Sequence, residues 1–184
     1  MKACPQTESQ SVLEHGFSVK NYTMDLLNHL ELGTDLKYEW KLPEWIYEEK
    51  DFILQHLADR KTIKTYTTLH DCGKPFCLEI DSEGRRHFPD HAKISYNTFI
   101  KFYDKSEAAE LILHDMDIHT VKSEGVEEFS KLPYSVTLLI VGLAEIHSNA
   151  KMFGGIDSTS FKIKHKSISK RGKQIISIIK NNEN

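Results

Sequence analysis

Residues 133–150 read PYSVTLLIVGLAEIHSNA and contain the longest apolar run of the chain, 136–144. Apolar side chains recur here with the period of an α-helix. The run is too short to cross a bilayer. This stretch therefore predicts a helix of a globular protein, and its one carboxylate, Glu145, stands four residues after Val141 and seven after Leu138, on an apolar face.

The same periodicity predicts helices along most of the chain. They are expected at 9–32, after Pro43, around 63–69, and at 91–102, 106–119 and 167–179. Between Phe76 and Pro89 the pattern alternates and then reaches Ser-Glu-Gly, which predicts a short extended loop or hairpin. The expected fold class is a compact all-α bundle of roughly seven helices.

Composition limits the class of protein further. The chain has 184 residues, of which 39% are hydrophobic and 28% charged, as in an ordinary soluble globular domain. Its cysteines number three and form no CxxC pair, which favours a reducing compartment. The N-terminus has no basic stretch followed by an apolar one, so we expect no signal peptide. These features predict a cytoplasmic protein that does not enter membranes.

Charge is unevenly distributed. From Phe161 onward basic residues outnumber acidic ones seven to one, whereas the preceding part is acidic. We therefore expect a domain at 1–160 and a basic, partly helical tail at 161–184. Such a tail either attracts the phosphates of a nucleotide or nucleic acid or is simply a solvated end.

Several ionisable residues fall on predicted apolar helix faces. His15, His70, His114 and Glu145 each do so, on four different predicted helices. One such histidine is usually a satisfied core residue, but four buried ionisable groups suggest a common partner. Asp71 and His91 can add further ligands. The set contains no thiolate, which predicts a divalent cation (Mn, Co, Ni, Mg, Fe or Zn), as one or two ions.

The order of these residues resembles that of the HD-domain metal-dependent phosphohydrolases. The matching pieces are LEH (13–15), LHDCGKP (69–75), LHD (113–115) and LAE (143–145). The stretch GRRHFPDHAKIS (84–95) is similar to the HD domains attached to bacterial tRNA nucleotidyltransferases. The family normally has aspartate where this chain has Glu145, which leaves the geometry and metal preference of that ligand open.

The resemblance implies an HD-type helical bundle and a role for each residue. His15, His70, Asp71 and Glu145 would hold a metal ion that activates water for attack on phosphorus. His91 and His114 would add a second ion, bridged by Asp71, or bind the phosphate themselves. Lys74 would take part in catalysis as the partner of a phosphate or of a carboxylate. Lys93 and Ser95, within one turn of His91, would contact the same phosphate of the substrate.

The predicted function is hydrolysis of a phosphate ester in a nucleotide or RNA end, by a phosphodiesterase or phosphatase. Two alternatives remain open at this stage. One is a small-molecule nucleotidase or nucleoside triphosphate hydrolase. The other is a catalytically degenerate HD fold that binds a nucleotide without turnover, an option that Glu145 keeps open.

Overall fold

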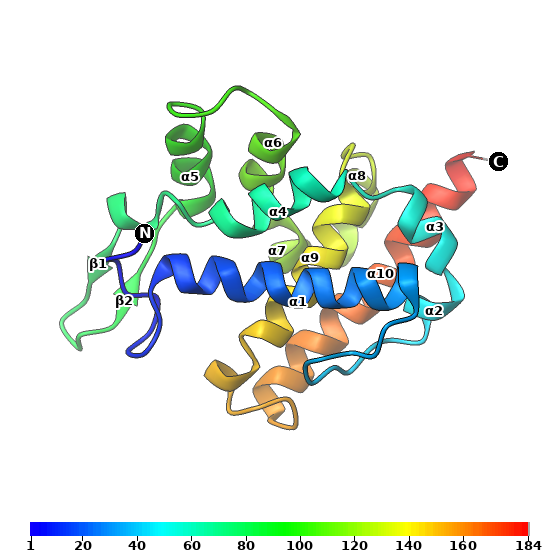
Figure 1. Cartoon of the computed structure of the whole chain (residues 1–184), viewed down its shortest axis with the longest axis horizontal. Helices are drawn as coiled ribbons and strands as arrows, with labels where there is room; N and C mark the ends of the chain where they lie inside the picture. The colour runs from blue at the N-terminus through cyan, green and yellow to red at the C-terminus, as the bar shows by residue number, and fades with distance from the viewer. Residues whose placement is uncertain (184) are drawn as a thin grey trace. The chain divides into compact units, whose positions relative to one another are not determined.

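The computed structural model describes residues 1–183 as a mostly helical chain, which confirms the all-α prediction (Figure 1). The chain divides into two compact units. The first consists of Met1–Lys20 and Asp59–Met116, and the second begins with Asn21–Ala58 and resumes at Asp117. Each unit thus combines separated stretches of sequence, a division that the sequence did not predict.

The first unit contains the start of helix α1 and three further helices. Its elements are α1 (Val12–Leu32, as far as Lys20), α4 (Arg60–Leu69), the short 3-10 helix η1 (Lys74–Phe76), β1 (Glu79–Ile80), β2 (Arg86–His87), α5 (His91–Phe99) and α6 (Glu107–Leu113). Helix α6 packs against both α4 and α5. Helix α5 also contacts η1, so the turn after α4 is held between two helices.

The predicted hairpin between Phe76 and Pro89 is confirmed. Strands β1 and β2 pair antiparallel, with Glu79 opposite His87 and Ile80 opposite Arg86. Asp81 closes the connection, since its carboxylate accepts the backbone N–H groups of Glu83 and Arg85, both at 2.9 Å. The hairpin lies at the surface and leaves the helices to form the core.

The second unit is built around α9, the helix predicted from 133–150. Its elements are the rest of α1, α2 (Trp45–Glu48), α3 (Lys50–Gln55), α7 (Asp117–Thr120), η2 (Ser123–Gly125), α8 (Val126–Ser130), α9 (Ser135–Ser148), η3 (Ala150–Phe153) and α10 (Thr159–Glu183). Nearly every residue of α9 is buried. Helix α10 packs along α9 and α8 (Figure 1).

Two predicted helices are each divided in the structure. The predicted helix 106–119 is wrong as a single element, because α6 ends at Leu113 and α7 starts only at Asp117. In the intervening turn the buried Asp115 accepts a hydrogen bond from the Tyr66 hydroxyl at 2.6 Å, a tertiary contact that periodicity does not reveal. The helix expected after Pro43 is broken at Glu49 into α2 and α3.

The basic C-terminal segment forms the larger part of one long helix. Helix α10 starts at Thr159, two residues before the predicted tail, and extends well past 167–179 on both sides. Several of its apolar side chains are buried within the second unit, namely Phe161, Ile168, Ile175 and Ile176, whereas Ile163 is exposed. No helix within residues 1–183 combines the length and apolarity that crossing a bilayer requires.

Two histidines fix the connection between α1 and α2. His147, buried in α9, donates from Nδ1 to the Leu143 carbonyl at 2.7 Å, and its Nε2 accepts the Lys41 N–H at 3.1 Å. The Lys41 carbonyl in turn accepts a hydrogen bond from His165 Nε2 at 2.6 Å. Burial lowers the pKa of His147 from its ordinary value to about 4, so this ring is neutral at pH 7.

This burial predicts an acid-sensitive second unit. Since the folded-state pKa of His147 lies below its ordinary value, the unfolded chain binds the proton more readily between about pH 6.5 and 4. Stability should therefore fall as pH is lowered through that window, by up to about 3 kcal/mol. The test is urea unfolding at pH 7, 6 and 5 in the presence of EDTA. The free energy of unfolding of His147→Gln should be lower than that of the wild type at pH 7 but should decrease less as the pH is lowered. Parallel pH profiles for the two proteins would contradict this assignment.

Candidate metal centre

The first turn of α1 positions His15. Ser11 and Glu14 form a reciprocal cap, in which the Glu14 N–H donates to Ser11 Oγ at 3.2 Å and the Ser11 N–H donates to Glu14 Oε2 at 2.7 Å. The helix therefore starts at a defined residue. His15 follows directly and is fully buried.

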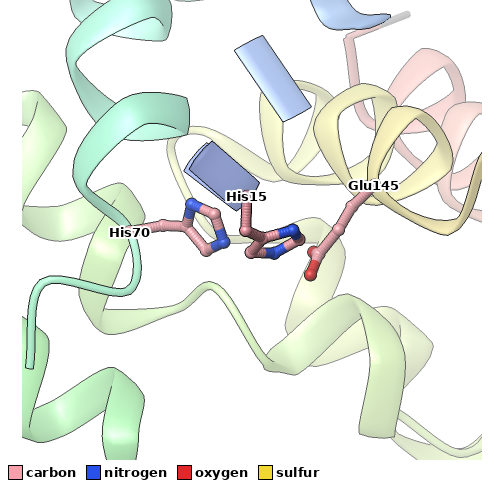
Figure 2. Close-up of side chains that lie close together, drawn as sticks. All are labelled: His15, His70 and Glu145. Carbon is pink, nitrogen blue, oxygen red and sulfur yellow. The ribbon is translucent and has the colours of Figure 1, made fainter. Parts of the chain in front are cut away.

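Gly16 allows α1 to approach the end of α4. A Cβ atom built at Gly16 would overlap the carbonyl group of Thr68, so no larger residue fits without a backbone shift. This contact brings His15 beside His70, which follows the last residue of α4. The two rings lie next to each other (Figure 2). Their centroids are 5.1 Å apart, with an angle of 68° between the planes.

The turn after α4 is anchored to α5. A Cβ atom at Gly73 would overlap the backbone of Ser95. The Gly73 N–H donates to the Ser95 hydroxyl at 2.9 Å, and the Cys72 thiol donates to the Ser95 carbonyl at 3.3 Å. Ser95 is fully buried. Its hydroxyl therefore supports the turn that carries Asp71, a role the sequence did not predict.

Asp71 is the centre of this cluster. Its Oδ2 atom lies 2.6 Å from Lys74 Nζ, 3.3 Å from His70 Nε2 and 3.6 Å from His15 Nε2. Its Oδ1 atom lies 3.8 Å from His91 Nε2. The carboxylate is 1% exposed. The structure thus brings together five of the predicted site residues, and it does so within the first unit.

The surroundings keep Asp71 ionised despite its burial. Burial alone raises the pKa of a carboxyl group because it penalises the charged form. Here interactions with His70 and with the Lys74 ammonium outweigh burial and hold the pKa of the Asp71 carboxyl well below its usual range. Lys74 itself is 7% exposed and also donates to the Gln6 side chain at 3.1 Å.

Backbone carbonyls fix the orientation of two of the imidazoles. His70 Nδ1 lies 2.9 Å from the Thr67 carbonyl, and His91 Nδ1 lies 2.9 Å from the Phe88 carbonyl. A carbonyl only accepts hydrogen bonds, so each Nδ1 carries a proton. In the neutral ring, Nε2 then presents its lone pair toward an oxygen of Asp71. Two acceptors face each other stably only when a cation or an added proton lies between them.

The donor set of the first unit fits a divalent cation. The nearest side-chain nitrogens to Asp71 Oδ2 are Lys74 Nζ at 2.6 Å and His70 Nε2 at 3.3 Å, so the carboxylate faces nitrogen atoms of both a cation and an imidazole. His15 and His70 offer ring nitrogens within 4.8 Å of each other. Histidines oriented through Nδ1 and a buried carboxylate are common ligands of borderline metals.

Glu145, the fourth predicted ligand, projects from α9 in the second unit (Figure 2). Its side chain is 16% exposed, and its Oε2 atom lies 3.0 Å from Nε2 of His119 on α7. The sequence did not predict a role for His119. A histidine that orients a carboxylate is a usual neighbour of metal ligands, but no sequence spacing relates these two residues.

The remaining predicted residues lie elsewhere in the first unit. His114 caps the end of α6 and is half-buried, next to the Asp115 that binds Tyr66. Lys93 is exposed on the first turn of α5. Their predicted roles in binding a second ion or a phosphate remain predictions.

Cys72 adjoins the cluster as a packed thiol. Burial and the neighbouring Asp71 charge raise the pKa of Cys72 to about 11, which keeps the thiol protonated at neutral pH. Cys72 therefore packs the turn after α4 against α5.

No protein-family model matches this chain, and comparison with curated proteins and with solved structures finds no match to it either. The interpretation of the site therefore depends on the chain's own residues and their geometry.

The close contact at Gly16 predicts a sensitive position. Gly16→Ala should destabilise the protein by about 1–3 kcal/mol, since overpacking outweighs the gain in helix propensity of about 1 kcal/mol. The backbone shift that relieves the overlap with Thr68 should also move His15 away from His70 and weaken the binding of Mn²⁺. Urea unfolding and calorimetric titration measure the two effects. Asn21→Ala, at an exposed position of α1, is the control; a Gly16→Ala protein as stable as this control would contradict the packing argument.

Proposed function

We propose that this protein is a metal-dependent phosphohydrolase of HD type that cleaves a phosphate ester of a nucleotide or of an RNA end. The observation that carries the proposal is the buried carboxylate of Asp71, toward which the Nε2 atoms of His70, His15 and His91 converge. The sequence resemblance supplies the type of reaction.

In this proposal His15, His70 and Asp71 hold a divalent cation, and Glu145 is a further ligand predicted from the sequence. A bound divalent cation supplies an acidified water molecule and polarises a phosphoryl oxygen. His91 faces the other oxygen of Asp71, which is the arrangement expected if that carboxylate bridges two ions.

Lys74 acts on Asp71 directly. Its ammonium lies 2.6 Å from Oδ2 and is held by Gln6 and by the ring of Phe88, with Nζ 5.1 Å from the ring centroid. These contacts favour a role in neutralising and positioning the carboxylate. The exposed Lys93 is better placed to meet a phosphate from solvent.

Removing a ligand should abolish a metal-dependent activity. We expect Mn²⁺- or Co²⁺-dependent hydrolysis of bis(p-nitrophenyl) phosphate or a 2′,3′-cyclic nucleotide by the wild-type protein. His70→Ala and Asp71→Asn should lower it by at least about 100-fold, because even partners of metal ligands typically change activity 10- to 100-fold. His87→Ala, an exposed histidine on the hairpin, is the matched control and should keep full activity.

The choice of substrate separates the alternatives. Turnover of nucleoside monophosphates or triphosphates alone would favour a nucleotidase or triphosphate hydrolase over a phosphodiesterase. A protein that binds Mn²⁺ and nucleotides without turning them over would be the degenerate binding module. That option is supported by Ser95 and Lys74, two predicted substrate contacts whose polar groups are engaged within the protein. Full activity of His70→Ala would refute the metal centre.

A second experiment distinguishes a metal centre from a simple buried ion pair. Lys74→Met leaves the Asp71 carboxylate without its ammonium partner, which typically costs about 3–5 kcal/mol when the charge is buried. If the cluster binds cations, Mn²⁺ at 100 times its Kd or more should raise the free energy of unfolding by about 2.7 kcal/mol or more. The melting temperature of Lys74→Met should therefore rise more with Mn²⁺ than that of the wild type.

The control for this experiment is Lys64→Met, at an exposed position of α4. It should show the wild-type response to Mn²⁺. If Mn²⁺ leaves the melting temperature of all three proteins unchanged, Lys74 and Asp71 form a structural ion pair and the proposed centre is wrong.

A further inference from the structure

Helix α10 carries a row of lysines on one face. Lys162, Lys166, Lys170 and Lys173 recur at intervals of three or four residues, which places them along one side of the helix. All four are exposed. The row, which we call the lysine face, is about 16 Å long at 1.5 Å per residue.

The opposite side of α10 packs into the core of the second unit. Phe161, Ile168 and Ile175 are buried within the second unit. The lysine face is therefore held in a fixed orientation and its four charges are displayed together.

These four lysines form no ion pairs in the described part of the chain, although the charge of Lys162 helps to lower the pKa of Asp157. Within residues 1–183, no carboxylate lies at ion-pair distance from any of them. Lys180, farther along the same helix, differs in this respect, because its ammonium lies 2.7 Å from Glu49. Four like charges on one face repel one another, and a polyanion would relieve that repulsion.

A groove runs beside the lysine face. It has a volume of about 590 Å³, and Lys166, Lys170 and Lys173 form one wall, together with Ser169 and Gln174. The other wall belongs to the start of α2 and includes Glu44 and Glu48. Carboxylates and amides accept hydrogen bonds from the amino groups of bases. Cations that bind phosphates therefore stand next to groups that can read a base edge.

Lysines beside a groove lined with hydrogen-bond acceptors fit some classes of polyanion better than others. A duplex keeps its bases stacked inside, whereas a single strand can turn a base into a groove. A helix that binds a membrane surface needs its apolar face free to enter the lipid, and that face of α10 is buried in the core. The glutamates of the second wall favour a ligand that presents hydrogen-bond donors to them, as the amino group of a base does and the carboxylate of an acidic peptide does not.

We propose that the lysine face and its groove form a binding surface for single-stranded nucleic acid. The lysines bind successive phosphates, and the groove accepts a base. This surface belongs wholly to the second unit and requires no metal ion, so it is independent of the phosphohydrolase proposal.

The test is fluorescence anisotropy with a labelled mixed-sequence RNA 12-mer in EDTA, which removes any contribution from metal-dependent chemistry. The full-length wild-type protein should bind the RNA, and the affinity should fall with salt. The variant Lys166→Gln/Lys170→Gln/Lys173→Gln should bind at least about tenfold more weakly. The slope of log K against log salt should also become shallower by about 2, since each lost phosphate contact contributes about 0.7.

The matched control is Lys61→Gln/Lys64→Gln/Lys101→Gln, which removes the same charge from exposed positions of the first unit. It should bind like the wild type, and all three proteins should melt alike. Equal RNA binding by the two triple variants would overturn the proposal, as would no RNA binding by the wild type at 50 mM KCl.

Three competing ligands test the class of partner. Inorganic polyphosphate, polyglutamate and phosphatidylserine vesicles are compared with the RNA at equal charge. The proposal expects RNA to bind most tightly, with Glu44→Ala/Glu48→Ala weakening RNA binding despite the removal of negative charge, because both hydrogen-bond acceptors of that wall are lost. Polyphosphate, polyglutamate or vesicles binding as tightly as RNA would show a non-specific cationic surface and would overturn it.

Discussion

The structure of the first unit depends on one buried charge. A carboxylate as deeply buried as Asp71 is tolerated only with positive charge beside it. Lys74 supplies one such charge, and the imidazoles of His15, His70 and His91 converge on the same group. Other features of this unit hold that arrangement in place: the capped start of α1, the glycine contact between α1 and α4, and the Ser95 hydroxyl that fastens the turn to α5.

The orientation of the histidine rings determines which of their nitrogen atoms face Asp71. The Thr67 and Phe88 carbonyls accept hydrogen bonds from Nδ1 of His70 and His91, so Nε2 is the nitrogen of each ring that faces Asp71. His147 in the second unit is the instructive contrast. Both of its nitrogens have backbone partners, Leu143 and Lys41, and burial keeps it neutral. The orientation of His70 and His91 leaves Nε2 facing Asp71, where the proposed cation would bind. His147, in contrast, is a core histidine with both nitrogens hydrogen-bonded.

Periodicity predicted the helices well where a long apolar face determines them. α1, α4, α9 and the hairpin lie where the pattern placed them, and His15 and His70 are buried as their positions indicated. The break between α6 and α7 could not be predicted, because it accompanies a hydrogen bond between distant residues, Tyr66 and Asp115. The burial of Lys74 was equally hidden, since a Gly-Lys-Pro turn gives no sign of what will cover it.

The sequence by itself determined that the chain is helical and that ionisable side chains occupy apolar helix faces, because both follow from local spacing along the chain. Only the tertiary structure decided which of these side chains meet. It gathered His15, His70, Lys74 and His91 around the carboxylate of Asp71. It also gave the Ser95 hydroxyl a supporting role and paired Glu145 with His119. Such pairings depend on how closely backbones approach and on where turns point, and no periodic pattern encodes either.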